Sequence, residues 1–272
     1  MTEQVEVQLP KTLREATRIQ IGLTFAAPYE ALITVGINGA LMSAAWFLLP
    51  TSLKDDLFTL HGTLAFALVL ASWMYSDVPA TNVLGPDAQR IVAALDDPVM
   101  FRRLILAKNI ALWMLVSPVC ALVALGVGLS DHDPLATLYT IVWIVIVPFG
   151  FLAISAWVGI LFPYHALPIR YRWEHQKPRK RMLVRWLGLA LTPYGLVPVL
   201  ALLLMTPSLL LWGFTSAHGL SQKLPDNDLG LGVALACAIS LTCSVVGHRV
   251  GSSLAQRRKA WLTEFLNDPL RG

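Results

Sequence analysis

Residues 104–129 read LILAKNIALWMLVSPVCALVALGVGL, and this stretch decides the class of fold. Its only charged residue is Lys108, which lies near one end. A helix needs about 20 apolar residues to cross the hydrocarbon of a bilayer, because each residue adds about 1.5 Å of length. The stretch therefore predicts a membrane-spanning helix.

Similar apolar runs recur along the rest of the chain. The predicted spans all lack Asp, Glu and Arg, and they cover residues 31–49, 57–75, 104–129, 135–162, 186–214 and 229–247. The fourth and fifth are longer than the minimum and contain prolines, so we expect them to be tilted or kinked. The sequence thus predicts an all-α, polytopic membrane protein with six transmembrane helices.

The composition supports this class. Of the 272 residues, 56% are hydrophobic and 14% are charged, whereas soluble domains carry about 25% charged residues. Too little charge is present to cover a water-facing surface, which excludes soluble and disordered proteins. Cys120, Cys237 and Cys243 lie inside apolar runs without metal-ligand spacing, so we expect neither a disulfide framework nor a metal site.

The basic residues predict the orientation. Of the 21 Lys and Arg residues, 18 lie before the first span, after the last, or in the connections that follow spans two and four, and Lys108 lies just inside the third span on the same side; the other two are Lys54 and Lys223. Basic loops stay in the cytoplasm. We therefore expect both termini to be cytoplasmic and the protein to lie in the inner (cytoplasmic) cell membrane.

Three regions follow from this layout. Residues 1–30 form a cytoplasmic and interfacial segment with an amphipathic helix before the first span, residues 31–250 form the transmembrane domain, and residues 251–272 form an amphipathic tail expected to lie on the inner leaflet. We expect a further set of basic residues to face the membrane or a partner: Arg102, Arg103, Arg179, Lys180 and Arg181.

The chain lacks the residues that several enzyme and transporter classes require. It contains no GxxxxGK[ST] motif, no HExxH motif and no cluster of aspartates, so we expect no catalytic residue and no ATP hydrolysis by this chain. The middles of the spans hold no carboxylate, which argues against ion-coupled transport. Asn38 is polar within the first span, and it fits either a bond between helices or a substrate contact.

The most informative loop follows the second span. Residues 76–108 read SDVPATNVLGPDAQRIVAALDDPVMFRRLILAK. The Gly-Pro-Asp sequence at 85–87 predicts a turn, with Asp87 as the N-cap of a short helix at 88–95. Ile91, Val92 and Leu95 would form its apolar side, and Asp96-Asp97-Pro98 would end it. The residues alone also fit a solvated hairpin with a surface helix.

This loop resembles one in the membrane subunits of ABC exporters of the ABC-2 type. The similarity rests on Asn82, Gly85, Asp87, Ala94-Leu95, Pro98, Arg102-Arg103-Leu104 and Lys108, on the position of the loop between spans two and three, and on the amphipathic helix before span one. In that family the loop is a coupling helix that docks on a cytoplasmic ATPase, and the resemblance implies that residues 76–103 are the coupling loop of this chain. The resemblance assigns the following residues to that contact: Asn82, Gly85, Pro86, Asp87, Arg90, Ile91, Leu95 and Pro98.

The resemblance implies a permease subunit that works with a second permease copy and a separate ABC ATPase subunit. The partner would use ATP and Mg, while this chain would bind no cofactor and no nucleic acid. A hydrophobic or amphipathic substrate would cross the membrane by alternating access, along a path that includes Asn38, Trp46 and Tyr194. The alternative is a membrane protein that anchors or regulates a partner without transporting anything.

Overall fold

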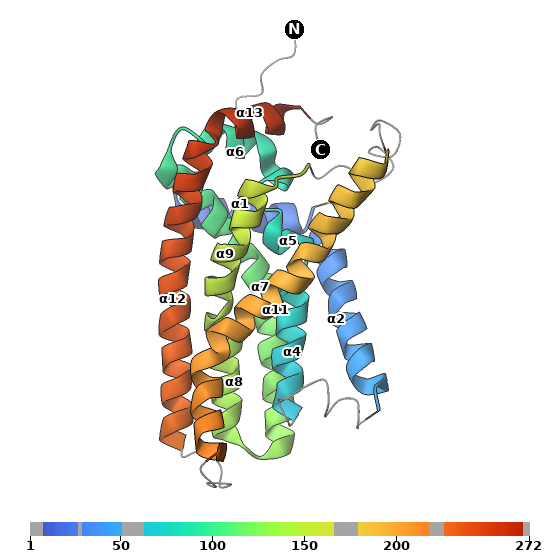
Figure 1. Ribbon diagram of the computed structural model, residues 1–272, viewed down its shortest axis with the longest axis vertical. Coiled ribbons are helices and arrows are strands. Elements are labelled where there is room, and N and C mark those ends of the chain that lie inside the picture. The colour runs from blue at the N-terminus through green and yellow to red at the C-terminus, as the bar shows by residue number, and fades with distance from the viewer. Residues whose placement is uncertain (1–7, 27–28, 51–62, 166–178, 218–225, 269–272) are drawn as a thin grey trace.

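The computed structural model describes residues 8–26, 29–50, 63–165, 179–217 and 226–268 (Figure 1). Among these residues the regular elements are helices, and none is a strand. The predicted all-α fold is therefore confirmed for the described part of the chain.

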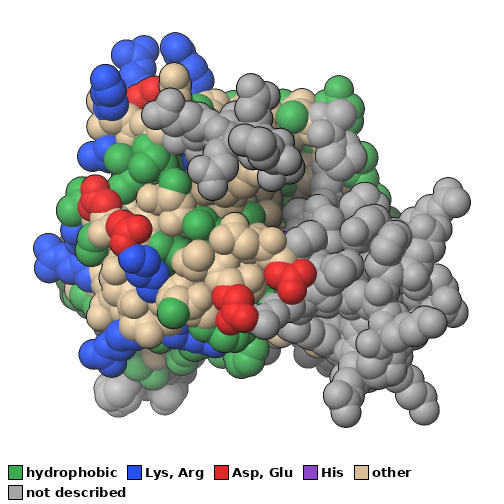
Figure 2. Space-filling view, turned by 90° about the horizontal axis from the view of Figure 1, so that it is seen from above, with side chains coloured by type: hydrophobic (Ala, Val, Ile, Leu, Met, Phe, Trp, Pro, Cys, Tyr) green, Lys and Arg blue, Asp and Glu red, His purple; other side chains and the backbone are tan. Residues whose placement is uncertain are grey.

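Long helices form a bundle along the long axis of the molecule (Figure 1). They are α2 (Glu30–Leu48), α4 (Thr63–Tyr75), α7 (Pro98–Asp131), α8 (Pro134–Ile146), α9 (Pro148–Leu161), α11 (Arg179–Ala217) and α12 (Asp226–Arg257). Short elements gather at one end: α1 (Leu13–Thr24), α5 (Val78–Thr81), η1 (Gly85–Asp87), α6 (Ala88–Ala94) and α13 (Lys259–Asn267). Figure 2 looks onto this end, where charged side chains of both signs gather. Charged side chains of this kind favour contact with water.

Four helical stretches of the described chain are long and apolar enough to cross a bilayer: Ala31–Leu48, Pro98–Ser130, Pro134–Leu161 and Gly230–Arg257. Two shorter apolar helical stretches, Leu64–Tyr75 and Leu191–Pro207, match the second and fifth predicted spans in part. Residues 57–62 of the second predicted span lie outside the described residues. Large apolar side chains such as Leu41, Leu122 and Val245 are exposed on the long helices. The protein is therefore embedded in a membrane.

The fourth predicted span is interrupted at one residue, Val147, which precedes its proline and keeps helical backbone angles (φ −63°, ψ −32°). Pro148 starts α9 and has no N–H to donate to the Ile144 carbonyl. The carbonyl oxygens at this point also accept from other helices: Ile144 from Ser117 Oγ at 2.7 Å, Val145 from Trp113 Nε1 at 2.7 Å, and Val147 from Ser240 Oγ at 2.8 Å. The break thus fixes α8 and α9 to α7 and α12.

The fifth predicted span behaves differently from the fourth. Pro193, Pro198 and Pro207 lie inside α11, which is continuous from Arg179 to Ala217. Figure 1 shows α11 oblique to α8 and α9. The expected tilt is therefore present, whereas the prolines do not divide the helix.

The amphipathic tail departs from its predicted position. The expected helix is present as the end of α12 and as α13, which are separated at Arg258. Leu262, Phe265 and Leu266 of α13 are buried and belong to one apolar cluster with Ile91 and Leu95 of the loop. The expectation that the tail lies on the inner leaflet is corrected, because its apolar face is covered by the chain itself.

Gly159 provides a test of the packing that positions the loop. A Cβ atom at this position of α9 would collide with the carbonyl oxygen of Thr81 in α5 and would lie 3.1 Å from the Val83 nitrogen. Gly159→Ala should therefore destabilise the protein by about 1–3 kcal/mol, the usual cost of overpacking. The measurement is the thermal unfolding temperature of the purified protein in detergent.

Gly126→Ala is the matched control for this substitution, because a Cβ at Gly126 in α7 has no neighbour within 4 Å. This variant should unfold at or above the temperature of the wild type. If both variants unfold at the same temperature, the close approach of α5 to α9 is refuted.

Candidate functional site

The connection from α4 to α7 is folded throughout and lies at the charged end of the bundle. Its turns are closed by side chains that accept from backbone N–H groups. Asp77 Oδ1 accepts from Val78 N at 2.6 Å, Asn82 Oδ1 from Gly85 N at 3.2 Å, and Asp97 Oδ1 from Val99 N at 2.8 Å. The predicted turn at Gly85 and the predicted short helix are both present. The connection is therefore ordered by its own side chains, and α6 lies on its surface.

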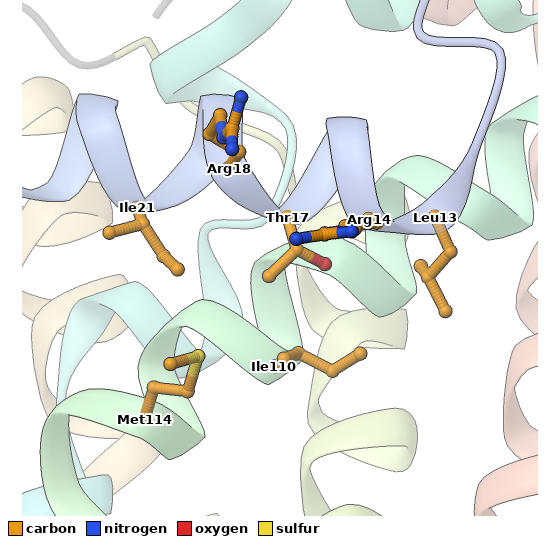
Figure 3. A pocket seen from close by; sticks show the side chains of 7 residues that line it. All are labelled: Leu13, Arg14, Thr17, Arg18, Ile21, Ile110 and Met114. Carbon is orange, nitrogen blue, oxygen red and sulfur yellow. The ribbon is translucent and has the colours of Figure 1, made fainter.

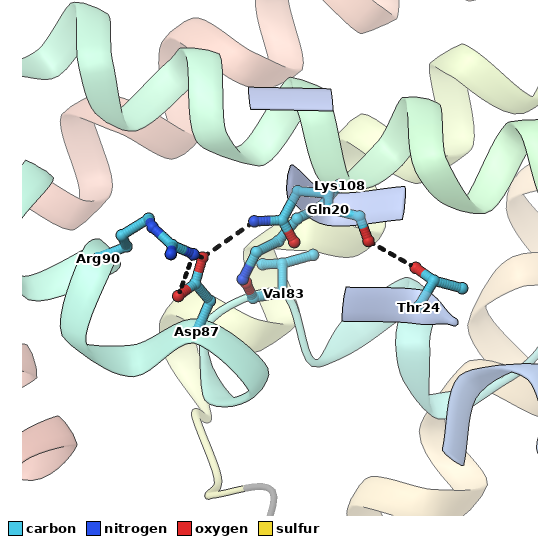
Figure 4. A network of polar contacts seen from close by, with 6 residues as sticks. All are labelled: Gln20, Thr24, Val83, Asp87, Arg90 and Lys108. Atoms are coloured by element: carbon cyan, nitrogen blue, oxygen red, sulfur yellow. Dashed lines mark hydrogen bonds and ion pairs between the residues drawn. The ribbon is translucent and has the colours of Figure 1, made fainter. Parts of the chain in front are cut away.

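Asp87 occupies the N-cap position of α6, but its side chain makes no capping bond. Its carboxylate instead accepts from Arg90 Nη1, at 3.0 Å to each oxygen, and from Gln20 Nε2 of α1 at 3.0 Å (Figure 4). The predicted capping role is corrected, because stronger partners compete for the carboxylate. Asp87 joins the loop to the amphipathic helix α1.

Gln20 is a functional candidate that the sequence did not reveal. It is 5% exposed, and its backbone carbonyl accepts from Thr24 Oγ1 at 2.9 Å. The sequence held one indication of this role, because Gln20 lies one helical turn from Ala16 and so on the same face of α1. The structure shows that this face is buried. A polar side chain on the buried face of an amphipathic helix requires a partner, and here the partner is distant in sequence.

Two basic residues of α7 fasten the same region. Lys108 Nζ donates to the Val83 carbonyl in the loop, and Arg103 Nη1 donates to the carbonyls of Pro10 and Lys11 at 3.0 and 2.7 Å. Arg103, predicted to face the membrane or a partner, therefore holds the segment that leads into α1.

The other predicted basic residues do not join this site. Arg102 Nε donates to the Pro98 carbonyl of its own helix at 3.3 Å. The side chains of Arg179, Lys180 and Arg181 lie outside the described part of the chain. Their expected role stays a prediction.

The apolar side of α6 faces inward. Ile91 and Leu95 are fully buried and Asn82 is 5% exposed, so these three predicted contact residues stabilise the loop from within and offer no surface to a partner. The sequence did not indicate this, because α13, which covers them, is remote along the chain. The exposed residues of the loop are Pro86, Gln89, Ala93, Asp96, Asp97 and Pro98, while Gly85, Asp87 and Arg90 are partly buried.

The C-terminal helices hold the outer end of α6. Gln256 Nε2 donates to the Leu95 carbonyl at 2.6 Å, Ser252 Oγ donates to the Pro98 carbonyl at 3.2 Å, and Lys259 forms an ion pair with Asp96. The loop is thereby linked to α1, α7, α12 and α13. We call residues 76–97 with these attachments the loop platform.

A second polar group lies between α2, α4 and α11. Tyr194 Oη donates to Asn38 Oδ1 at 2.9 Å, and the Tyr194 ring lies 5.5 Å from the ring of Trp73. The structure therefore brings together two of the residues predicted to line a path. Trp46 lies two turns further along α2, where its ring contacts Phe66 at 5.4 Å, so it does not join this group.

Asp77 extends this group and was missed in the sequence. It follows the last residues of an apolar run, yet it is 4% exposed. Burial raises the pKa of its carboxyl, partly offset by the Thr34 hydroxyl and the Val78 amide. Thr34 is one helical turn from Asn38 on α2, and Trp73 is one turn before Asp77.

Three atoms of this group have no hydrogen-bond partner among the described residues: Asn38 Nδ2, Trp73 Nε1 and Asp77 Oδ2. Two of them are donors and one is an acceptor. Buried polar atoms without partners are costly, and a ligand that both donates and accepts would satisfy them. We call Asn38, Trp73, Asp77 and Tyr194 the polar cluster.

Among the described residues, no group of His, Cys, Asp and Glu has the arrangement of a metal site. Comparison with family models, with curated proteins and with solved structures found no match to this chain.

Asp77→Asn tests the burial of the carboxylate. Because the folded state raises this pKa above the ordinary value of 3.8, the folded protein binds the proton more tightly than the unfolded chain does. Stability then falls as the pH rises from the unfolded pKa through the folded one. The variant keeps an oxygen for Val78 N and removes the charge, so it should unfold at a higher temperature than the wild type at pH 7.5.

This gain should shrink as the same unfolding measurement is repeated at progressively lower pH, because the pKa of the Asp77 carboxyl is raised in the folded protein and the wild type then loses the buried charge as well. Asp97→Asn is the control, since it replaces an exposed carboxylate that also caps a helix. An equal gain in both variants, or one independent of pH, would contradict the assignment.

Proposed function

We propose that this chain is the membrane-spanning subunit of an ATP-driven exporter of the ABC-2 type. It would cross the inner membrane six times with both termini in the cytoplasm. The observation that supports this most is the loop platform, which is a folded unit at the charged end of the bundle with a small exposed face.

The attachments of the loop platform suit the transmission of force. Asp87 connects it to α1, the Val83 carbonyl to α7, and Leu95 and Asp96 to α12 and α13. Gly159 allows α5 to contact α9 without an intervening side chain. Packed protein interiors move between discrete arrangements and do not yield locally. A push on α6 would therefore displace several helices together.

The energy would come from a separate ABC ATPase subunit, which would use ATP and Mg. The surface that it would contact is formed by Pro86, Gln89, Ala93 and Asp96, which are all exposed. A second permease copy would complete the transport path, as the resemblance implies.

The polar cluster supports an amphipathic substrate. Its unpaired donors and acceptor lie among apolar helices, so they could bind a polar group while the surrounding surface accommodates an apolar one. The alternative is a protein that anchors or regulates a partner. The coverage of α6 by α13 also fits that role, because it fixes the exposed surface in place.

The predicted topology is tested with reporter fusions. Alkaline phosphatase is active outside the cytoplasm, and fluorescent protein folds inside it. Phosphatase fused after residue 54, 132 or 223 should be active, whereas fluorescence should follow fusion after residue 90, 175 or 272. An active phosphatase at residue 272 would refute the cytoplasmic C-terminus.

Docking is tested at Ala93, whose side chain is exposed on α6. The chain is co-expressed with ABC ATPases encoded near its gene and then purified by an affinity tag. Ala93→Arg should reduce the retained ATPase about ten-fold or more, since 1.4 kcal/mol lost from an interface corresponds to ten-fold. A charge at fully buried Leu95 would test folding and not docking.

Ala260→Arg is the control, because Ala260 is exposed on the neighbouring helix α13. This variant should retain the ATPase, and both variants should keep the unfolding temperature of the wild type. Retention by both variants, or failure of the wild type to retain any ATPase, would rule out docking on the loop platform.

A further inference from the structure

An open surface groove of about 490 Å³ lies along the line where α1 packs on α7. Leu13, Arg14, Thr17, Arg18 and Ile21 line it from α1, and Ile110 and Met114 line it from α7. Figure 3 shows Leu13, Thr17 and Ile21 pointing toward α7, while Arg18 projects from the other edge of α1. The groove therefore has an apolar floor and a basic rim.

The two arginines of the rim are one helical turn apart, so their side chains can reach one group. Both are exposed, and neither has an ion pair or hydrogen bond with another described residue. Glu15, the acidic residue between them in sequence, accepts from Lys11 N at 2.8 Å. Two unpaired guanidinium groups suit an oxyanion, because arginine binds phosphate oxygens with paired N–H donors.

The floor of the groove suits a hydrocarbon chain. Ile110 and Met114 belong to the membrane-spanning stretch Pro98–Ser130, and Met114 is 49% exposed. The basic rim lies on α1, at the charged end of the bundle. A molecule in the groove would thus have its anionic group at the membrane surface and its chain along α7.

We propose that one anionic glycerophospholipid binds in this groove, with its phosphate between Arg14 and Arg18 and an acyl chain along Ile110 and Met114. The bound lipid holds α1 against α7. Ala16 and Gln20 lie on the adjacent, buried face of α1, and Gln20 bonds to Asp87. Occupancy therefore strengthens the attachment of the loop platform. The proposed lipid site requires that the protein lie in a membrane, and it does not depend on the transport function.

The experiment is native mass spectrometry of the purified full-length chain in detergent, titrated with phosphatidylglycerol or with phosphatidylcholine of the same acyl chains. The wild type should bind one phosphatidylglycerol in preference to phosphatidylcholine. Each arginine near an anionic lipid contributes about five-fold, so Arg14→Gln with Arg18→Gln should weaken phosphatidylglycerol binding by roughly 25-fold.

A matched control removes the same charge elsewhere. Arg249 and Arg257 are exposed on α12, and Arg249→Gln with Arg257→Gln should leave the preference unchanged. If both double variants lose phosphatidylglycerol binding to the same extent, the effect is one of general surface charge and the proposal is overturned. Equal binding of the two lipids by the wild type would also overturn it.

Met114→Trp tests the groove itself. The exposed position tolerates a larger side chain, which fills the floor and leaves both arginines in place. It should weaken phosphatidylglycerol binding without lowering the unfolding temperature of the lipid-free protein. Unchanged binding would show that the arginines attract the lipid without the groove, and would refute the site.

Discussion

Backbone groups within a bilayer have no water to pair with, and an unpaired carbonyl there costs several kcal/mol. This constraint explains the centre of the bundle. Pro148 removes one helical hydrogen bond, and Ser117, Trp113 and Ser240 donate to the carbonyls around the break. The proline thus interrupts the hydrogen bonding between α8 and α9, and the three donors join this point to α7 and α12. This single set of bonds therefore links four helices at the centre of the bundle.

At the charged end of the molecule, side chains of the chain itself provide hydrogen-bond partners for backbone groups. The loop platform closes its turns with Asp77, Asn82 and Asp97, and accepts Lys108 from α7 at the Val83 carbonyl. This explains why a short connection between two membrane helices can hold a defined shape and present a fixed surface.

The sequence predicted features that depend on local pattern. Apolar runs located the helices, Gly85-Pro86 located the turn, and the amphipathic segment located α1. The sequence did not predict features that depend on pairing across long separations. The Asp87 carboxylate does not cap α6, because it accepts from Gln20, which lies 67 positions away. The apolar side of α6 is covered by α13, which is also remote in sequence. Asp77 looked like a loop residue, because hydropathy alone does not distinguish a buried residue at the end of a helix from an exposed one.

Asp77 also connects the two candidate sites. Its Oδ1 atom caps α5, which is the first turn of the loop platform, and its Oδ2 atom lies unpaired in the polar cluster. A shift of α5 would therefore move a carboxylate oxygen relative to Asn38 and Tyr194, whose own bond joins α2 to α11. No intermediate chain of residues is needed to relate the loop platform to the interior of the bundle. A mechanical coupling between the loop platform and the polar cluster would act through the Asp77 side chain. A polar group bound at Asp77 Oδ2 would then be displaced when α5 moves.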